Sequence, residues 1–413
     1  MRPSDLTLDN LLQADPDALY DQALRWRHAD GVAEDLKSAR RLFGFVALHG
    51  HSAARYQAGL MNQRGEGGEK NLVRALMWFR LAAGRDEPRA AAQIRRLSED
   101  LKPIEVRQSH ALVAEAEKAR SNFVTARKTG DAHAMASLGM QLFTGKGVEP
   151  DAALAVAWLQ RAASLNDADA QMFLAMAYAN GTGIPKNLPE AQRLFQMAAD
   201  QGHREAQYQW AQFLEQHSRQ AASHAKAIQL YEAAADQGHL PAQLRLGQLF
   251  KQDEVFSMPV IAEGTADGEA APVAKKPVHK RSHAPHLVRA LDYFTMAAEQ
   301  GHRDAQFELG QMYAQGLGTP QKFEDAIHWF QQAARQGHAK AQFNLAFQYA
   351  HGQGVEVDYL KAYEWYRISH LCGYPLAKAP MEFTAKKLSS GQVEMADWRA
   401  DSFIHQLEDH SHS

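Results

Sequence analysis

The stretch that decides the fold is RDAQFELGQMYAQGLGTPQKFEDAIHWFQQAARQGH (303–338), followed by AKAQFNLAFQYAHGQGVEVDYLKAYEWYRISHLCGY (339–374). The two segments align residue for residue at a period of 36, so that Leu309 falls on Leu345. A fixed period of this size predicts a solenoid of helical hairpins, in which each repeat buries its apolar face only against its neighbours. We therefore expect an all-α, right-handed solenoid of antiparallel helix hairpins.

Each repeat carries two apolar faces at helical spacing. In the last copy the first helix is expected to bury Ala341, Leu345, Ala346 and Tyr349, and the second to bury Ala362, Trp365, Tyr366 and Ser369. The small residues let the helices approach closely, and the aromatic pair fills the space between repeats. By the same register, Trp329 is predicted to be a buried residue between helices.

The loops and caps of the repeat also recur. Gly352 and Gly354 stand where the first helix must end, and glycine accepts the left-handed conformation found there. Asp358 stands where a side-chain oxygen can cap the second helix. The same register predicts caps at Ser223, Asn187, Asp151, Asn71 and Asp35, whereas Lys322 and His286 break the rule.

The full pattern, AxxxLGxxYxxGxGVxxDxxKAxxWYxxAAxxGH, resembles the Sel-one-like repeat, a relative of the tetratricopeptide repeat. The resemblance covers roughly residues 15–375. It implies an interaction scaffold, a role that such proteins commonly fill in bacteria, with proteins as ligands and no cofactor. The closing Gly-His pair recurs at His203, His239, His302 and His338. We expect these histidines to hydrogen-bond between repeats, because neighbours about 10 Å apart are too distant to share one metal ion.

The register predicts five segments. They are a short array of two repeats with closing helices (1–128), repeats three to five with the first helix of the sixth (129–250), a disordered insertion (251–285), the rest of the array (286–375), and a C-terminal cap and tail (376–413). Residues 90–128 leave the register, and a helix over 104–128 is expected to join the two arrays. Leu97-Ser98 and Leu388-Ser389 each precede a charged amphipathic helix, which predicts two closing elements because a terminal repeat lacks a covering neighbour.

The composition is that of an ordinary soluble protein, with 45% apolar and 23% charged residues. One cysteine, Cys372, and the lack of any 18-residue apolar run predict a cytoplasmic protein without a membrane segment. The net charge of −3 gives no general attraction to nucleic acid. The chain contains no HExxH, GxSxG or CxxC motif, and its GxG loops do not continue as phosphate-binding motifs. We therefore expect neither enzymatic activity nor a cofactor or metal.

Two columns of residues on the first helices vary from repeat to repeat while the core positions stay nearly constant. The first column is Ser137, Phe173, Gln209, Arg245, Glu308 and Asn344, and the second is Gln141, Ala177, Phe213, Leu249, Met312 and Gln348. A line of exposed apolar side chains favours a contact surface. The predicted partner-binding residues are Phe173, Gln209, Phe213, Arg245, Glu308, Met312, Asn344 and Gln348. An ordinary solvated face is the plain alternative.

Two other functions stay open at this point. A helical-repeat protein can instead bind RNA, but that would require a basic groove, and both columns are close to neutral. The heptapeptide VFSMPVI (255–261) is apolar and lies in the insertion, so it could fold back and block the groove. The sequence indicates a protein or peptide partner without identifying it.

Overall fold

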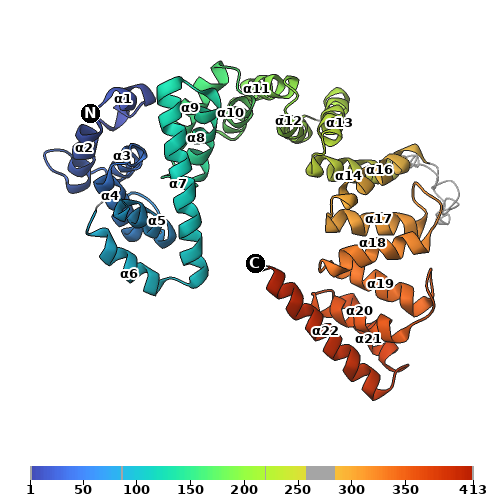
Figure 1. Ribbon diagram of the computed structural model, residues 1–413. Helices are drawn as coiled ribbons and strands as arrows, with labels where there is room; N and C mark the ends of the chain where they lie inside the picture. Colours follow the sequence, from blue (N-terminus) through green and yellow to red (C-terminus); the bar gives the residue numbers. More distant parts are fainter. Residues whose placement is uncertain (1, 85–86, 219, 257–283, 412–413) are drawn as a thin grey trace, which may run out of the picture. The chain divides into compact units, whose positions relative to one another are not determined.

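The structure is a computed structural model that describes residues 2–84, 87–218, 220–256 and 284–411. In these residues all regular structure is helical, as the repeat pattern predicts (Figure 1). The chain separates into two compact units, one ending at His217 and the other starting at Ser218. This boundary lies in the repeat that carries EQHSRQ in place of the glycine pair. It differs from the predicted boundary at residue 128, which lies within a helix (Pro103–Thr129) that contacts the next helix along the chain.

The first unit contains one short 3-10 helix and the first twelve α-helices. These are η1 (Pro3–Asp5), α1 (Leu8–Gln13), α2 (Pro16–His28), α3 (Leu36–Leu48), α4 (Ser52–Arg64), α5 (Leu72–Ala83), α6 (Ala90–Asp100), α7 (Pro103–Thr129), α8 (Ala132–Thr144), α9 (Ala152–Ser164), α10 (Ala168–Asn180), α11 (Leu188–Asp200) and α12 (Arg204–His217). Its hairpins are α2/α3, α4/α5, α8/α9 and α10/α11. We call the first helix of each hairpin the A helix and the second the B helix.

The second unit continues the same pattern. Its helices are α13 (Ala221–Asp236), α14 (Leu240–Phe256), α16 (Pro285–Glu299), α17 (Arg303–Gln315), α18 (Phe323–Arg335), α19 (Ala339–His351), α20 (Tyr359–Leu371), η2 (Pro375–Ala377), α21 (Lys378–Ala385) and α22 (Ser390–Ser411). The hairpins are α14/α16, α17/α18 and α19/α20. The insertion therefore interrupts the loop of one hairpin without separating its two helices. Helix α14 reaches Phe256, so the prediction of disorder from residue 251 is wrong at its start, and residues 257–283 with most of the heptapeptide lie outside the described residues.

The two glycines of each loop have different roles. Gly316 ends α17 in the left-handed conformation (φ +65°), as predicted for this register position. Gly318 also has a positive φ (+70°), and a Cβ atom there would lie 2.3 Å from the carbonyl oxygen of Leu287, at the start of the preceding B helix. A Cβ atom at Gly183 would lie at the same distance from the carbonyl oxygen of Ala152. The second glycine thus allows backbone contact between successive repeats.

The B helices are capped largely as predicted. The side chains of Asp35, Asn71, Asp151, Asn187 and Asp358 each accept a hydrogen bond from a backbone N–H three residues later. The prediction for Ser223 is wrong, because α13 begins at Ala221 and Ser223 lies in its first turn. Lys322 forms no side-chain cap, in agreement with its status as an exception.

The Gly-His closure caps the A helices, a role that the sequence analysis missed. Nδ1 of His338 accepts from the backbone N–H of Ala341 at 3.1 Å, and His51, His203, His239 and His302 repeat this bond. A contact with the preceding repeat is also present at three of these positions, and at the first of them Nε2 of His51 lies 3.2 Å from Asp17 Oδ1. Nε2 of His203 lies 3.0 Å from Asp169 Oδ1, and Nε2 of His338 lies 3.7 Å from Asp304 Oδ1. Each aspartate belongs to the preceding A helix.

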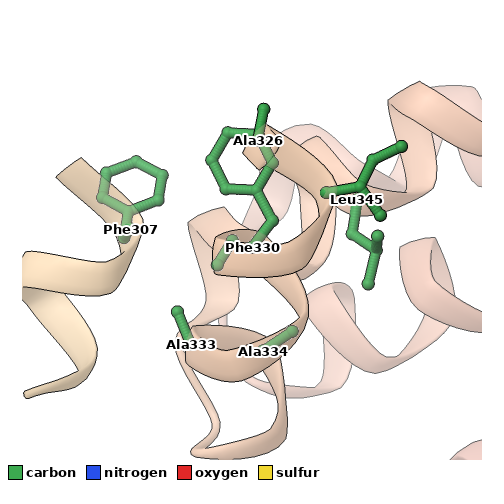
Figure 2. Packing of buried hydrophobic residues seen from close by; sticks show 8 residues of the cluster. Phe307, Ala326, Phe330, Ala333, Ala334 and Leu345 are labelled. Atoms are coloured by element: carbon green, nitrogen blue, oxygen red, sulfur yellow. The ribbon is translucent and has the colours of Figure 1, made fainter. Parts of the chain in front are cut away.

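The core of the second unit is built from alanines and rings. Phe330 of α18 is 1% exposed and lies between Phe307 and Leu345 of the neighbouring A helices (Figure 2). A Cβ atom at Gly310 would lie 2.7 Å from the Phe330 ring, so the glycine allows the ring to approach α17. The prediction for Trp329 is wrong, because this residue is only half-buried. The prediction for Trp365 is wrong for the same reason, since in both pairs the second ring, Phe330 or Tyr366, fills the core and the first is half-buried.

Helix α7 contributes a B helix in register, although residues 90–128 were predicted to leave the register. Its buried residues Ala119, Phe123 and Ala126 lie 36 positions before the buried Ala155, Leu159 and Ala162 of α9. A Cβ atom at Gly147 would lie 2.4 Å from the Ala116 backbone nitrogen, as the second glycine of a loop meets the preceding B helix elsewhere. The predicted joining role of this helix is confirmed, since α7 contacts α3, α5 and α8.

The last helix, α22, covers the final hairpin by packing on α20. The Tyr363 hydroxyl donates to Asp397 Oδ1 at 3.0 Å, and burial, together with that carboxylate, raises the pKa of Tyr363 to about 12. Helix α22 thus lies in the segment for which the sequence predicts a C-terminal cap.

Candidate partner-binding face

The eight predicted partner-binding residues all lie on A helices or on α12, but they belong to two different units. Phe173 of α10 and Gln209 and Phe213 of α12 are in the first unit. The other five are in the second unit, on α14, α17 and α19, and are Arg245, Glu308, Met312, Asn344 and Gln348.

The first column is accessible. Phe173, Gln209, Arg245, Glu308 and Asn344 are all half-buried, so part of each side chain meets solvent. Glu308 forms an ion pair with Lys251 (Oε2–Nζ, 2.5 Å), and Gln209 Nε2 donates to Glu205 at 2.8 Å. These five residues are accessible to a partner, and their role in binding stays a prediction.

The second column is largely core, which corrects the prediction. Met312 is 0%, Gln348 4% and Phe213 7% exposed. The physical reason is the helical repeat itself, since Met312 follows the buried Ala305 by seven residues and therefore shares its face. Phe213 likewise packs its ring on Phe195, with 5.4 Å between the centroids. Phe213 and Met312 thus support the fold rather than offer a contact surface.

Two hollows mark the second unit on the surface formed by α14, α17 and α19, which we call the A-helix face. One, the amide hollow, has a volume of about 240 Å³ and lies near the C-terminal ends of α17 and α19. It is lined by six amide side chains: Gln311, Gln315, Gln321, Asn344, Gln348 and Gln353. Phe347 also lines it and is 38% exposed. The structure thus brings the predicted residues Asn344 and Gln348 into one site, with Gln348 at its base.

The other, the histidine hollow, has a volume of about 500 Å³ and lies near the N-terminal ends of the same helices. Here His338 stacks on Phe307 with 4.4 Å between ring centroids, and Glu308 and Lys340 also line the site. Burial lowers the pKa of His338, which agrees with its capping role, because Nδ1 must be unprotonated to accept a hydrogen bond. This histidine is therefore held neutral and positioned as a structural residue.

Gln348 differs from its register counterpart in the first unit. Gln141 accepts a hydrogen bond at Oε1 from Asn122 Nδ2 (3.3 Å) and donates from Nε2 to the Glu115 carbonyl (3.2 Å). In the second unit Trp329 occupies the position of Asn122, and its ring cannot supply that amide donor. Gln348 Oε1 is accordingly buried without a hydrogen-bond partner among the described residues.

The described residues contain no group of three or more histidine, cysteine, aspartate or glutamate side chains placed to hold a metal ion. Within the same part of the chain, no helix is both long and apolar enough to cross a bilayer. The chemistry of the A-helix face is that of amide, aromatic and paired charged groups, which suits binding.

The Sel1 repeat family model matches residues 52–86, 132–167, 168–203, 204–239, 287–302, 303–338 and 339–369, which together exceed half of the chain. The chain belongs to the Sel1 repeat family. Its α2/α3 hairpin lies outside the matched residues although it has the same hairpin form. Sel1 repeat proteins share the tetratricopeptide-like fold that commonly serves as a protein-interaction scaffold, and the family is generally non-catalytic.

Solved structures similar to this Sel1 repeat protein come from several bacteria. A protective antigen with this fold from uropathogenic Escherichia coli is 24% identical, with 96% of this chain and 85% of that chain covered and a TM-score of 0.38. A Sel1 repeat protein from Oxalobacter formigenes is 25% identical (62% and 94% covered, TM-score 0.42), and an immunity protein from Pseudomonas aeruginosa is 19% identical (65% and 83% covered, TM-score 0.30). These TM-scores are too low to carry a functional argument. Among curated proteins, none matches this chain significantly.

Proposed function

We propose that this Sel1 repeat protein is a non-enzymatic adaptor that binds an extended segment of a partner protein along the A-helix face of the second unit. The observation that carries the proposal is the amide hollow, where two successive repeats contribute six amide side chains. An amide both donates and accepts hydrogen bonds, so it can pair with the main chain of a bound segment whatever the sequence of that segment.

Side-chain selectivity would come from the groups beside the amides. Phe347 offers an exposed ring for an apolar partner side chain, and its ring stacks on His351 at 4.0 Å, which restricts its rotation. The Glu308–Lys251 pair offers one charge of each sign on the same face. A mixed, near-neutral face of this kind favours a polypeptide over RNA, which the sequence left open as an alternative.

The proposed compartment is the cytoplasm. Cys372 is the only cysteine and is half-buried, and burial raises the pKa of its thiol. A thiol of raised pKa is a poor nucleophile, so this residue supports packing rather than redox chemistry.

The test is selection of peptides from a phage-displayed library on the full chain, followed by calorimetry with the selected peptide. We expect Asn344→Ala with Phe347→Ala to weaken binding by about tenfold or more, since each loses a hydrogen bond or a ring contact. The matched control is Gln108→Ala, which removes an exposed amide of α7 in the first unit, outside both predicted columns. Loss of binding in the control alone, or selection of no peptide with RNA bound instead, would contradict the proposal.

A further inference from the structure

A strongly charged hollow lies in the first unit, where its lining comes from three neighbouring segments. These are the first turns of α3, the loop that ends at the start of α5, and the loop that precedes α9. The hollow has a volume of about 510 Å³, which is within the range of small-ligand sites. We call it the basic hollow. It does not depend on the adaptor function proposed for the second unit.

Two ion pairs build the wall of the basic hollow. Arg40 and Glu149 are 8% and 6% exposed at their side chains and lie 2.5 Å apart (Nε–Oε1), and Asn62 bridges the same two groups. Arg41 Nε lies 2.6 Å from Asp151 Oδ2. Both carboxylates are therefore neutralised by arginines of α3. Because these ion pairs and hydrogen bonds fix the side chains of the wall, the neighbouring side chains of the hollow are also held in place.

Three other cations line the hollow and form no ion pair with a carboxylate among the described residues: Lys37, Lys70 and Arg74. Arg74 is half-buried, and its side chain donates from Nη2 to the Gly145 carbonyl oxygen at 3.3 Å. The only remaining carboxylate of the lining, Glu69, is exposed. Five cations thus face three carboxylates in a chain whose net charge is −3. Burial removes hydration from the Arg74 guanidinium, and the attraction of Glu149 offsets only part of that cost, so an anion from solution would offset more of it.

Backbone groups add to the attraction for an anion. Ala152 and Ala153, the first two residues of the 13-residue helix α9, line the hollow, and the Asp151 cap takes only the N–H of Leu154. The first N–H groups of a helix carry partial positive charge and lack partners within the helix. Ammonium, guanidinium and backbone N–H donors therefore line one hollow.

We propose that the basic hollow binds a phosphate group. A phosphate monoester carries nearly two negative charges at pH 7 and three acceptor oxygens, which suits a site with two lysines, one arginine and helix N–H donors. The lining contains no aromatic side chain on which a nucleobase could stack, so a single-stranded nucleic acid fits it poorly. The phosphate is either free inorganic phosphate or the phosphomonoester of a protein side chain, two sources with the same group.

The experiment is calorimetric titration of the full chain with inorganic phosphate and with a short phosphoserine peptide. The same peptide with glutamate in place of phosphoserine and a short RNA oligonucleotide are the comparison ligands. We expect Lys70→Met, and separately Arg74→Met, to weaken phosphate binding by about tenfold each, because each removes a charge-assisted contact. Lys128→Met is the matched control, since it removes an exposed lysine of the same unit far from the lining in sequence, and it should leave binding unchanged.

The outcomes separate cleanly. Binding of either phosphate source that is lost in Lys70→Met and kept in Lys128→Met supports the proposal, and the tighter ligand identifies the source. Equal binding of the glutamate peptide, binding of RNA alone, or no binding to any phosphate ligand would overturn it. Thermal melts with added phosphate give a second readout, because a ligand that binds only the folded chain raises Tm in the wild type and less in the variants.

Discussion

The contact made by the second loop glycine predicts a large and specific effect of a single methyl group. Gly183 and Gly202 both have left-handed backbones, with φ of +73° and +77°. A Cβ atom at Gly183 would lie 2.3 Å from the Ala152 carbonyl oxygen, whereas one at Gly202 would meet nothing within 4 Å. The two positions therefore share the cost of placing alanine in this conformation and differ in the contact between repeats.

The expected magnitudes follow from that difference. Alanine in the left-handed region costs about 1–2 kcal/mol, and this is the full effect expected for Gly202→Ala. Gly183→Ala adds a clash with backbone, which cannot rotate away as a side chain can, and overpacking of this kind costs about 1–3 kcal/mol more. We therefore expect Gly183→Ala to lower the free energy of unfolding by about 2–5 kcal/mol in total.

The assay is urea denaturation of the full chain, followed by circular dichroism at 222 nm for wild type and both variants. The quantity to compare is the shift in the midpoint of the transition that includes the first unit. Equal shifts for the two variants would show that the loops do not hold successive repeats in backbone contact, and the account of the second glycine would be refuted.

Three further outcomes are expected. Phe330→Ala should lower the free energy of unfolding by about 3–5 kcal/mol and Trp329→Ala by clearly less, because only the phenylalanine is fully buried; a larger loss for Trp329→Ala on chemical denaturation would reverse the assignment. The folded-state pKa of His338 is below its ordinary value of 6.5, so its contribution is present above that pH and is lost as the pH falls through the folded pKa. His338→Asn, which keeps a cap, should make thermal stability fall less between pH 7 and 5 than in the wild type, and an unchanged pH profile would count against the histidine. Gln348→Leu should be nearly neutral and Gln141→Leu should cost about 1–3 kcal/mol in denaturant midpoints, because only the second change leaves buried partners unpaired; equal costs would contradict the difference.

Much of the fold could be predicted because each structural position of the repeat recurs several times along the chain with the same kind of residue. The 36-residue period locates the hairpins, the loop glycines and most B-helix caps from the sequence alone. The repeat register of the second half of α7 could not be recognised, because no glycine pair precedes it and Asp131 stands in place of histidine after Gly130. Its core spacing was nevertheless present, with Ala119 and Phe123 at 36 residues before Ala155 and Leu159.

The candidate site was less predictable, because exposure depends on which side of the helix a position faces. Phe213 and Met312 were taken from a column that varies in chemistry, yet variation also occurs in a core that repacks from repeat to repeat. Phe213 follows the core residue Ala206 by seven positions, and Met312 follows Ala305 by the same number. This spacing places each on a buried helix face. Which amides gather in one hollow could not be predicted, since that depends on how two neighbouring repeats meet.

The way in which α22 covers α20 bears on how the chain avoids polymerisation. Each hairpin of the array has a surface that receives the next hairpin, and α22 occupies that surface at the last one. A chain ending before Ser390 would leave this surface of α20 open, including the ring of Trp365, which packs on Phe403 of α22 with 5.6 Å between the centroids. Repeats of other molecules are built to fit such a surface, and a contact between unlike surfaces does not close on itself. Helix α22 thus shields this surface of α20 from a hairpin of another molecule.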